Sequence, residues 1–213
     1  MPFLSPIAIH RAGTVPFEEA LVMQRELHRG VAAGQKPNTL IIIEHPSVFT
    51  AGKRTEDHER PKDGTPVTDV DRGGKITWHG PGQLIGYPIV KLEKPHELVG
   101  FVRELESGLI KVCEYFGIDA VRVSGRSGVW ICDSKGERKI AAIGIRVATG
   151  VTMHGFALNV CPDLAPFRQI IPCGIDDADV TSLEIELGNK ITVDEVVPIV
   201  EKYLQESLGK VAK

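Results

Sequence analysis

The sequence predicts a mixed β-sheet flanked by helices, which places the chain in the α/β (α+β) class. Three observations support this class. Helical periodicity is confined to a few segments, short β-branched runs are numerous, and glycine and proline turns separate those runs at hairpin-like spacing. The 213 residues are enough for one domain with a sizeable core, and no internal repeat or low-complexity linker divides them. A single domain over residues 1–213 is therefore expected.

Three segments carry the apolar spacing of a helix. They are residues 16–33, 98–116 and 192–208, of which the second has the clearest steps of three and four. The third opens with a capping box at Thr192 and Glu195. Pro198 lies too far inside for an ideal helix, so a kink or a delayed start is expected. This tail is expected to form a small appended lobe.

Short runs of β-branched and aromatic residues predict the strands. The clearest is TLIIIEH at 39–45, whose unbroken apolar character is typical of a buried strand. The stretch from Pro46 to Pro66 is polar and rich in turn-forming residues, so it is expected to be a long loop. The remaining strands are expected at 67–70, 75–78, 84–90, 120–123, 129–132, 140–147, 151–160 and 181–187.

Bulk composition argues against several classes of protein. The formal net charge of −3 gives no reason to expect nucleic-acid binding. No apolar run approaches the roughly 20 residues that span a bilayer, and the N-terminus does not have the pattern of a signal peptide. The four cysteines, at 113, 132, 161 and 173, form no C-x-x-C pair, which suits neither structural zinc nor a dense disulfide framework. A cytoplasmic location is expected.

The first candidate for chemistry is RGGKITWHGPGQ at residues 72–83. Two glycines after Arg72 let the backbone approach a ligand closely, and His79 stands at the mouth of a second tight turn. Glycine turns on both sides of a short strand cost conformational entropy, which suggests a geometric purpose. A pair of hairpin turns with a surface histidine explains the pattern about equally well. The spacing is not that of a phosphate-binding P-loop.

The second candidate is Cys173, in the turn IPCGI. Pro172 fixes the backbone before it and Gly174 leaves space after it, as a reachable nucleophile requires. A free thiol has a pKa of about 8.5, so a catalytic cysteine needs a nearby cation, base or helix N-terminus. Cysteines are more often structural, and Cys113 on the clearest helix is expected to be a small buried hydrophobe.

The third candidate is Lys139, which opens KIAAIGIRV. In a regular strand Lys139 shares a face with Ala141 and Ile143, whereas Ala142 and Gly144 leave room for a ligand on the other face. A lysine on an apolar face can be partly desolvated and can pair with a thiolate. The alternative is a lysine at a strand end that extends into solvent.

A second histidine, His154, lies in the strand expected at 151–160. No carboxylate or thiol stands at ligand spacing, so His79 and His154 do not predict a metal site. His154 is interpreted either as a residue that supports the substrate site from behind or as a core histidine with satisfied hydrogen bonds. Either histidine beside Cys173 would make a Cys/His hydrolase, and that alternative stays open.

Taken in order and at this spacing, RGGKITWHGPGQ, KIAAIGIRV, VTMHGFALNV and IPCGI resemble the lipoyl(octanoyl) transferases, also called octanoyl-[acyl-carrier-protein]:protein N-octanoyltransferases. The likeness covers nearly the whole chain, from EHP at 44–46 to TSLEIELG at 181–188. Two departures are minor: Trp78 replaces another aromatic, and Met153 stands where a polar residue is frequent. The resemblance implies the mixed sheet and flanking helices of lipoate-protein and biotin-protein ligases.

The resemblance also implies an activity and residue roles. Such an enzyme transfers an octanoyl or lipoyl group from an acyl carrier protein to a lysine of a lipoyl domain, the first step of endogenous protein lipoylation. Cys173 matches the nucleophile that carries the acyl group as a thioester, and Lys139 matches the lysine that lowers the pKa of its thiol. The residues that match substrate-binding segments are Arg72, Gly73, Gly74, Lys75, Ile76, Thr77, Trp78, His79, Ala142, Ile143, Gly144, Gly155, Phe156 and Ala157.

The implied donor is octanoyl-acyl carrier protein, and the implied acceptors are lipoyl domains of 2-oxoacid dehydrogenase E2 subunits and the glycine cleavage H protein. No cofactor, metal, nucleic acid or membrane is implied, and a monomer is expected. Residues 122–146 hold six basic and two acidic residues. This region is therefore hypothesised to dock the acidic carrier, with Arg126 and Arg138 among its contacts.

Three competing functions stay open at this point. An ATP-dependent lipoate ligase would share the fold but would need a nucleotide site and no catalytic cysteine. A Cys/His thioesterase would release free octanoic acid instead of modifying a lipoyl domain. A non-catalytic acyl-binding protein would behave the same with Cys173 replaced by serine.

Overall fold

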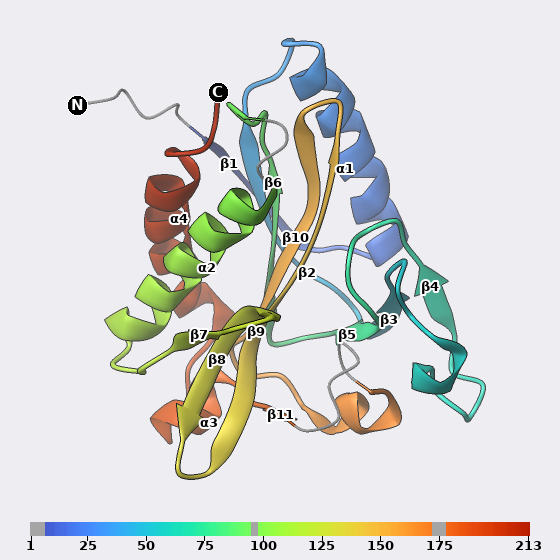
Figure 1. Ribbon diagram of the computed structural model, residues 1–213, viewed down its shortest axis with the longest axis vertical. Helices are drawn as coiled ribbons and strands as arrows, with labels where there is room; N and C mark the ends of the chain where they lie inside the picture. The colour runs from blue at the N-terminus through green and yellow to red at the C-terminus, as the bar shows by residue number, and fades with distance from the viewer. Residues whose placement is uncertain (1–6, 95–97, 172–177) are drawn as a thin grey trace.

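The computed structural model describes residues 7–94, 98–171 and 178–213, and a large mixed β-sheet forms its centre (Figure 1). In the described residues, its strands β1 and β2 pair in parallel, as do β9 and β11, and the other neighbours are antiparallel. In spatial order they are β1 (Ala8–Thr14), β2 (Thr39–Glu44), β6 (Gln83–Ile89), β10 (Val151–Asn159), β9 (Gly136–Ala148), β8 (Arg126–Asp133) and β7 (Val121–Val123), with β11 (Asp179–Val180) on β9.

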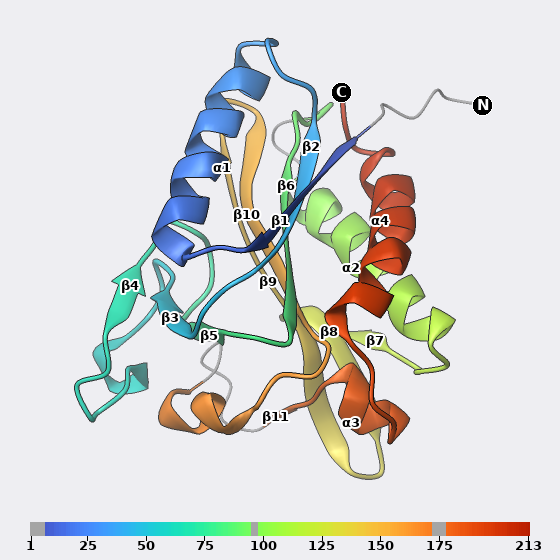
Figure 2. The same cartoon turned by 180° about the vertical axis from the view of Figure 1, so that it is seen from behind.

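Helices cover both faces of this sheet (Figures 1 and 2). α1 (Phe17–Ala32) lies over β6 and β10, and α2 (Leu98–Tyr115) and α4 (Val193–Leu208) pack against each other on the opposite face. The larger apolar core lies under α2 and α4, and a smaller one lies under α1. The predicted fold class and these three helices are confirmed. No described helix has the length and apolarity needed to cross a membrane.

A three-stranded sheet lies next to the beginning of α1. Its order is β4 (Val67–Asp69), β3 (Val48–Ala51) and β5 (Thr77–His79). Its apolar core includes Ile76, Trp78 and Phe167, the last from the 3-10 helix η2 (Ala165–Gln169). The long loop predicted for 46–66 is partly wrong, because β3 and the 3-10 helix η1 (Asp57–Glu59) lie within it. With only four residues, β3 is too short to show a clear alternation of apolar and polar residues in the sequence.

The strand predicted for 181–187 is a helix, α3 (Leu183–Leu187). Its alternating apolar residues suggested a strand, but Leu183 is fully buried whereas Ile185 is 58% exposed. Ser182 caps the helix by accepting a hydrogen bond from the Ile185 N–H, and Gly188 ends it in a left-handed conformation, φ 67°. The capping residues at the two ends of this segment therefore outweigh its short alternation of apolar residues.

Helix α4 starts at Val193 with the predicted capping box, so the delayed start expected from Pro198 is wrong. The appended lobe is also wrong, because Leu204 and Leu208 are fully buried in the larger core. Gly108 of α2 permits this close packing, since a Cβ there would lie 3.2 Å from Leu204 Cδ2. The C-terminal helix therefore completes the main core.

Candidate active site

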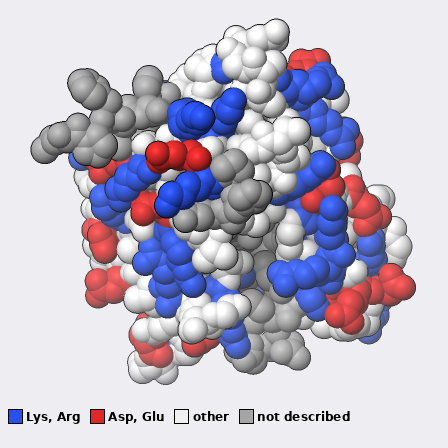
Figure 3. All heavy atoms as spheres, turned by 45° about the horizontal axis from the view of Figure 1, so that its top comes forward, with Lys and Arg blue, Asp and Glu red and all other residues white. Residues whose placement is uncertain are grey.

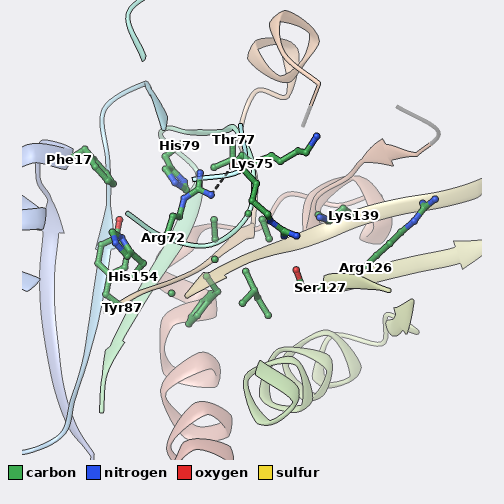
Figure 4. A pocket seen from close by; sticks show the side chains of 18 of the residues that line it. Phe17, Arg72, Lys75, Thr77, His79, Tyr87, Arg126, Ser127, Lys139 and His154 are labelled. Carbon is green, nitrogen blue, oxygen red and sulfur yellow. Dashed lines mark hydrogen bonds between the residues drawn. The ribbon is translucent and has the colours of Figure 1, made fainter. Parts of the chain in front are cut away.

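A cavity of about 240 Å³ lies between strands β9 and β10, the beginning of α1 and the segment that leads into β5 (Figure 4). Small and apolar residues of β9 and β10 face it, and its described lining contains no aspartate or glutamate. The lining residues are Phe17, Arg54, Arg72, Gly74, Lys75, Thr77, His79, Tyr87, Gly125, Arg126, Ser127, Lys139, Ala142, Ile143, Gly144, His154, Gly155, Phe156 and Ala157. This combination suits an apolar chain attached to a polar or anionic group.

A β-bulge in β9 brings Lys139 to the cavity side of the sheet. Val129 of β8 pairs with Ala141, whereas the next residue, Trp130, pairs with Lys139, so Ile140 is an extra residue in β9. Consequently Ile140 and Ala141 both belong to the larger core, while Lys139 lines the cavity. The expectation that Lys139 shares a face with Ala141 is wrong, because the bulge interrupts the alternation on which it rested.

The Lys139 side chain is held inside the protein. Lys139 is only 7% exposed, and its Nζ lies 4.6 Å from the centroid of the Trp130 ring, within cation–π distance. The Lys139 carbonyl accepts a hydrogen bond from the Thr181 N–H (3.0 Å), next to β11. The alternative of a lysine extended into solvent is therefore wrong. Among the described residues no carboxylate pairs with this ammonium, so it can serve an anionic group in the cavity.

Arg72 organises the loop on one side of the cavity. Its guanidinium donates hydrogen bonds to the carbonyl oxygens of Thr50 (2.8 Å), Lys75 (2.8 Å) and Gly73 (3.1 Å). Gly74 follows with φ 86°, in the left-handed region that favours glycine. The arginine thus shapes the cavity wall by binding backbone carbonyls, and its contact with substrate stays a prediction.

The other predicted substrate residues of this segment divide between cavity and core. Those that line the cavity are Gly74, Lys75, Thr77 and His79. Ile76 and Trp78 lie instead in the core of the smaller sheet, where Trp78 packs edge-on against Phe167 and donates from Nε1 to Ser47 Oγ (2.9 Å). Gly73 donates its N–H to the Ile145 carbonyl (3.1 Å), which joins the loop to β9.

His79 belongs to a buried polar group beside the cavity. His45 Nδ1 lies 2.6 Å from the Val15 carbonyl, which only accepts, so His45 Nε2 accepts from the Tyr87 hydroxyl (2.7 Å). His79 Nδ1 lies 3.3 Å from Gln83 Oε1. Burial, followed by the neighbouring basic groups, lowers the pKa of His79 to about 3. His79 is therefore neutral at physiological pH.

The buried His79 should make the protein less stable in mild acid. Its unfolded pKa is about 6.5 and its folded pKa about 3, so between these values only the unfolded state binds the proton. The free energy of unfolding should therefore fall as pH is lowered from about 6.5, with this group contributing up to ~1.4 kcal/mol per pH unit. Urea unfolding of His79→Gln should show a shallower pH dependence than wild type.

The matched control for this measurement is His10→Gln, on the exposed part of β1. Between pH 5 and pH 7, the free energy of unfolding of this variant should change with pH as steeply as that of wild type. An unchanged slope in His79→Gln would assign the acid sensitivity to other groups.

His154 links β10 to the loop that contains Arg72. Its Nε2 lies 2.7 Å from Asp71 Oδ1, and Arg146 also pairs with Asp71. The His154 backbone has φ 60°, and its N–H donates to Gln24 Oε1 (2.9 Å). Burial lowers the pKa of His154 despite the carboxylate. The ring lines the cavity but its Nε2 is directed to Asp71, and its supporting role stays a prediction.

The cavity wall on the sheet is built from the predicted small residues. Ala142, Gly144 and Ala157 line it together with Gly155. A Cβ on Gly144 would lie 2.9 Å from the Arg72 side chain, and one on Gly155 only 1.8 Å from the Gly86 carbonyl oxygen. Larger residues at these two positions would displace the loop or the neighbouring strand.

Several lining residues were not predicted from the sequence. Phe17, Arg54 and Tyr87 come from separate parts of the chain, Gly125 lies in the β7–β8 turn, and Ser127 is the second residue of β8. Arg126, the first residue of β8, also lines the cavity, although the sequence suggested it only as a contact of the carrier. None belongs to a glycine-rich motif or stands at diagnostic spacing from Lys139. The GR sequence at 125–126 was the one available signal, because an exposed turn with a cation is a frequent binding element.

Cys173 lies outside the described residues, together with Pro172 and residues 174–177. The described residues on either side are anchored near the cavity: the Ile171 N–H donates to the Glu59 carbonyl (3.3 Å), and Val180 pairs with Lys139. Cys113 is buried as expected, and burial raises the pKa of its thiol to about 12.

Comparison with known proteins supplies the family. The model of the lipoyl protein ligase A/B catalytic domain matches residues 16–205. An octanoyltransferase from Acidothermus cellulolyticus is 60% identical over 203 residues, which cover 95% of this chain and 92% of that protein.

Solved structures share the fold at low sequence identity. A bipartite lipoate protein ligase from Thermoplasma acidophilum is 16% identical with a TM-score of 0.72, covering 96% of this chain and 84% of that one. A biotin protein ligase from Aquifex aeolicus, in complex with biotin and ATP, is 16% identical with a TM-score of 0.56, covering 95% and 71%. Both confirm the fold that the sequence predicts. The family match and the 60% identical relative place the chain in the octanoyltransferase family, within the lipoyl protein ligase A/B catalytic domains.

Proposed function

We propose that this octanoyltransferase moves an octanoyl or lipoyl group from acyl carrier protein to a lysine of a lipoyl domain through a thioester on Cys173. The acceptors are lipoyl domains of E2 subunits and the glycine cleavage H protein, and residues 1–213 act as one monomeric catalytic domain. The observation that carries the proposal is the buried ammonium of Lys139. It lies at a cavity whose described lining residues include no carboxylate, on the strand that pairs with the segment following Cys173.

In the first half-reaction, the Cys173 thiolate attacks the thioester carbonyl of the donor. The carrier thiolate leaves from the tetrahedral intermediate and takes up the proton that Cys173 gave up. The Lys139 ammonium favours the thiolate by charge proximity, and each unit of pKa shift corresponds to ~1.4 kcal/mol. One thioester replaces another, so this step needs no nucleotide.

In the second half-reaction, the neutral ε-amine of the acceptor lysine attacks the acyl-cysteine. The Cys173 thiolate leaves, an amide forms, and the proton lost by the amine returns to the Cys173 sulfur, which restores the starting enzyme. Backbone N–H groups are suitable donors to the developing oxyanion.

The apolar wall of the cavity accounts for binding of the acyl chain. Burial contributes about 0.8 kcal/mol per methylene, which amounts to several kcal/mol for an octanoyl group. The small residues Ala142, Gly144 and Ala157 keep this space open on the sheet side.

Filling that space should change chain-length preference. Ala142→Leu adds three carbon atoms at the cavity wall, so kcat/KM for an octanoyl donor should fall at least about tenfold. A butanoyl donor should lose less, because it occupies less of the cavity. The control is Val99→Leu, which changes a side chain 73% exposed on α2 and should leave the octanoyl-to-butanoyl ratio unchanged. Equal losses for both donors would contradict this assignment of the acyl site.

The Cys/His hydrolase is disfavoured by the two histidines. A histidine with a pKa of about 3, such as His79, is too weak a base to activate a thiol at neutral pH. His154 directs its Nε2 to Asp71. Of the three basic residues that the sequence suggested as partners of Cys173, Lys139 therefore remains.

The test of the proposal is intact-protein mass after incubation with octanoyl-acyl carrier protein. We expect an octanoyl adduct that hydroxylamine removes and that passes to an apo lipoyl domain without ATP. Transfer that requires ATP would indicate a ligase instead. Release of stoichiometric octanoic acid without lipoyl-domain modification would indicate a thioesterase, and the absence of both would indicate an acyl-binding protein.

A further inference from the structure

The basic residues of 122–146 are largely engaged within the protein. Arg138 has a side chain 11% exposed and forms ion pairs with Asp133 (2.8 Å) and Glu186 (2.9 Å). Arg126 pairs with Glu137 (2.9 Å). The sequence-based hypothesis that Arg138 contacts the carrier is therefore unsupported, because its donors already satisfy two carboxylates.

Unengaged positive charge lies on the other side of the site. Arg54, Lys62 and Arg168 are exposed, and within the described parts of the chain their side chains have no hydrogen bond, ion pair or cation–π contact. They come from three segments: the β3–η1 connection, the residues after η1, and η2. Figure 3 shows lysine and arginine side chains on both sides of a hollow in the molecular surface.

These three cations line two adjacent hollows. Arg54 lines the acyl cavity, whereas Lys62 and Arg168 line a surface groove of about 420 Å³. Glu59, Asp63, Ile170 and Ile171 also line this groove. The 3-10 helices η1 and η2 lie side by side at this position in both ribbon views (Figures 1 and 2).

The groove and the cavity meet at one ion pair. Lys75 of the cavity wall binds Glu59 of the groove at 2.5 Å, and the Glu59 carbonyl accepts the N–H of Ile171 (3.3 Å). Ile171 also lines the groove and stands two residues before Cys173. The groove therefore leads to the segment that carries the proposed nucleophile.

We propose that this groove, with Lys62 and Arg168 on its rim and Arg54 at the cavity mouth, is the docking surface for the acyl carrier protein. The inference rests on the proposed function. An acidic carrier and its phosphate-bearing arm complement three exposed cations that have no acidic partner among the described residues. The apolar Ile170 and Ile171 would contact the uncharged part of the arm.

Charge reversal tests this surface. The double variant Lys62→Glu/Arg168→Glu should raise KM for octanoyl-acyl carrier protein at least about tenfold at low salt. It should also reduce the dependence of kcat/KM on salt, because rim charges act mainly on association. The charge-matched control is Arg29→Glu/Lys190→Glu, at two exposed residues elsewhere on the surface, and it should keep the wild-type KM.

Two further measurements separate docking from other roles. A neutral octanoyl thioester of N-acetylcysteamine lacks carrier and phosphate, so its kcat/KM should fall much less than that of the carrier donor. Acylation of wild type by this small donor also tests the proposed function independently of docking. The neutral variant Lys62→Gln/Arg168→Gln should give a smaller increase in KM than the charge reversal. If the charge-reversal variant does not fold, the neutral variant tests the same surface.

Three results would overturn the inference. They are an unchanged carrier KM in both groove variants, an increase in KM for the lipoyl domain instead, and equal losses with both donors. The second result would assign the groove to the acceptor, and the third would indicate damage to the acyl site.

Discussion

Replacing Cys173 with serine should abolish the octanoyl adduct and reduce transfer to a lipoyl domain by at least about 10³-fold. The physical reason is that a serine hydroxyl is far less ionised than a thiol at neutral pH and is a poorer leaving group from the acyl-enzyme. Intact-protein mass after incubation with octanoyl-acyl carrier protein measures the adduct, and modification of an apo lipoyl domain measures transfer.

The matched control is Cys132→Ser, which changes an exposed cysteine on β8. This variant should form the adduct and transfer the group like wild type. If Cys173→Ser retained full transfer, a covalent intermediate on this residue would be contradicted and direct attack of the acceptor on the donor would remain.

Replacing Lys139 with methionine should reduce kcat/KM by about 10²- to 10⁴-fold. Methionine keeps much of the apolar stem against Trp130 but removes the ammonium, which lies 4.6 Å from that ring. Loss of the positive charge should raise the pKa of the Cys173 thiol, because the thiolate loses its neighbouring cation. The rate of alkylation of Cys173 by iodoacetamide, followed against pH, should therefore have a higher midpoint than in wild type.

Lys135→Met is the control, since Lys135 is exposed in the β8–β9 turn and does not line the cavity. Its alkylation midpoint and activity should equal those of wild type. A Lys139→Met enzyme with low activity but an unchanged midpoint would contradict thiolate stabilisation and would leave Lys139 a role in proton transfer.

The sequence determined the elements that depend on local signals. The apolar periodicity of α1 and α2 and the capping box at Thr192 are properties of neighbouring residues, and the structure has these helices at nearly the predicted bounds. The four ordered motifs predicted the family, which the comparisons confirm. Glycine and alanine positions in β9 and β10 also indicated where space for a ligand lies.

Only the tertiary structure decided which way several of those residues face. Lys139 lines the cavity because β9 contains one more residue than β8 at Ile140, and a bulge depends on strand pairing that the KIAAIGIRV segment alone does not specify. Ile76 and Trp78 belong to a small core because β3 and η2 pack on them. Arg138 is engaged because Glu186, which is distant in sequence, joins the nearby Asp133 in pairing with it. Local spacing predicts the elements, but register and long-range packing decide their exposed faces.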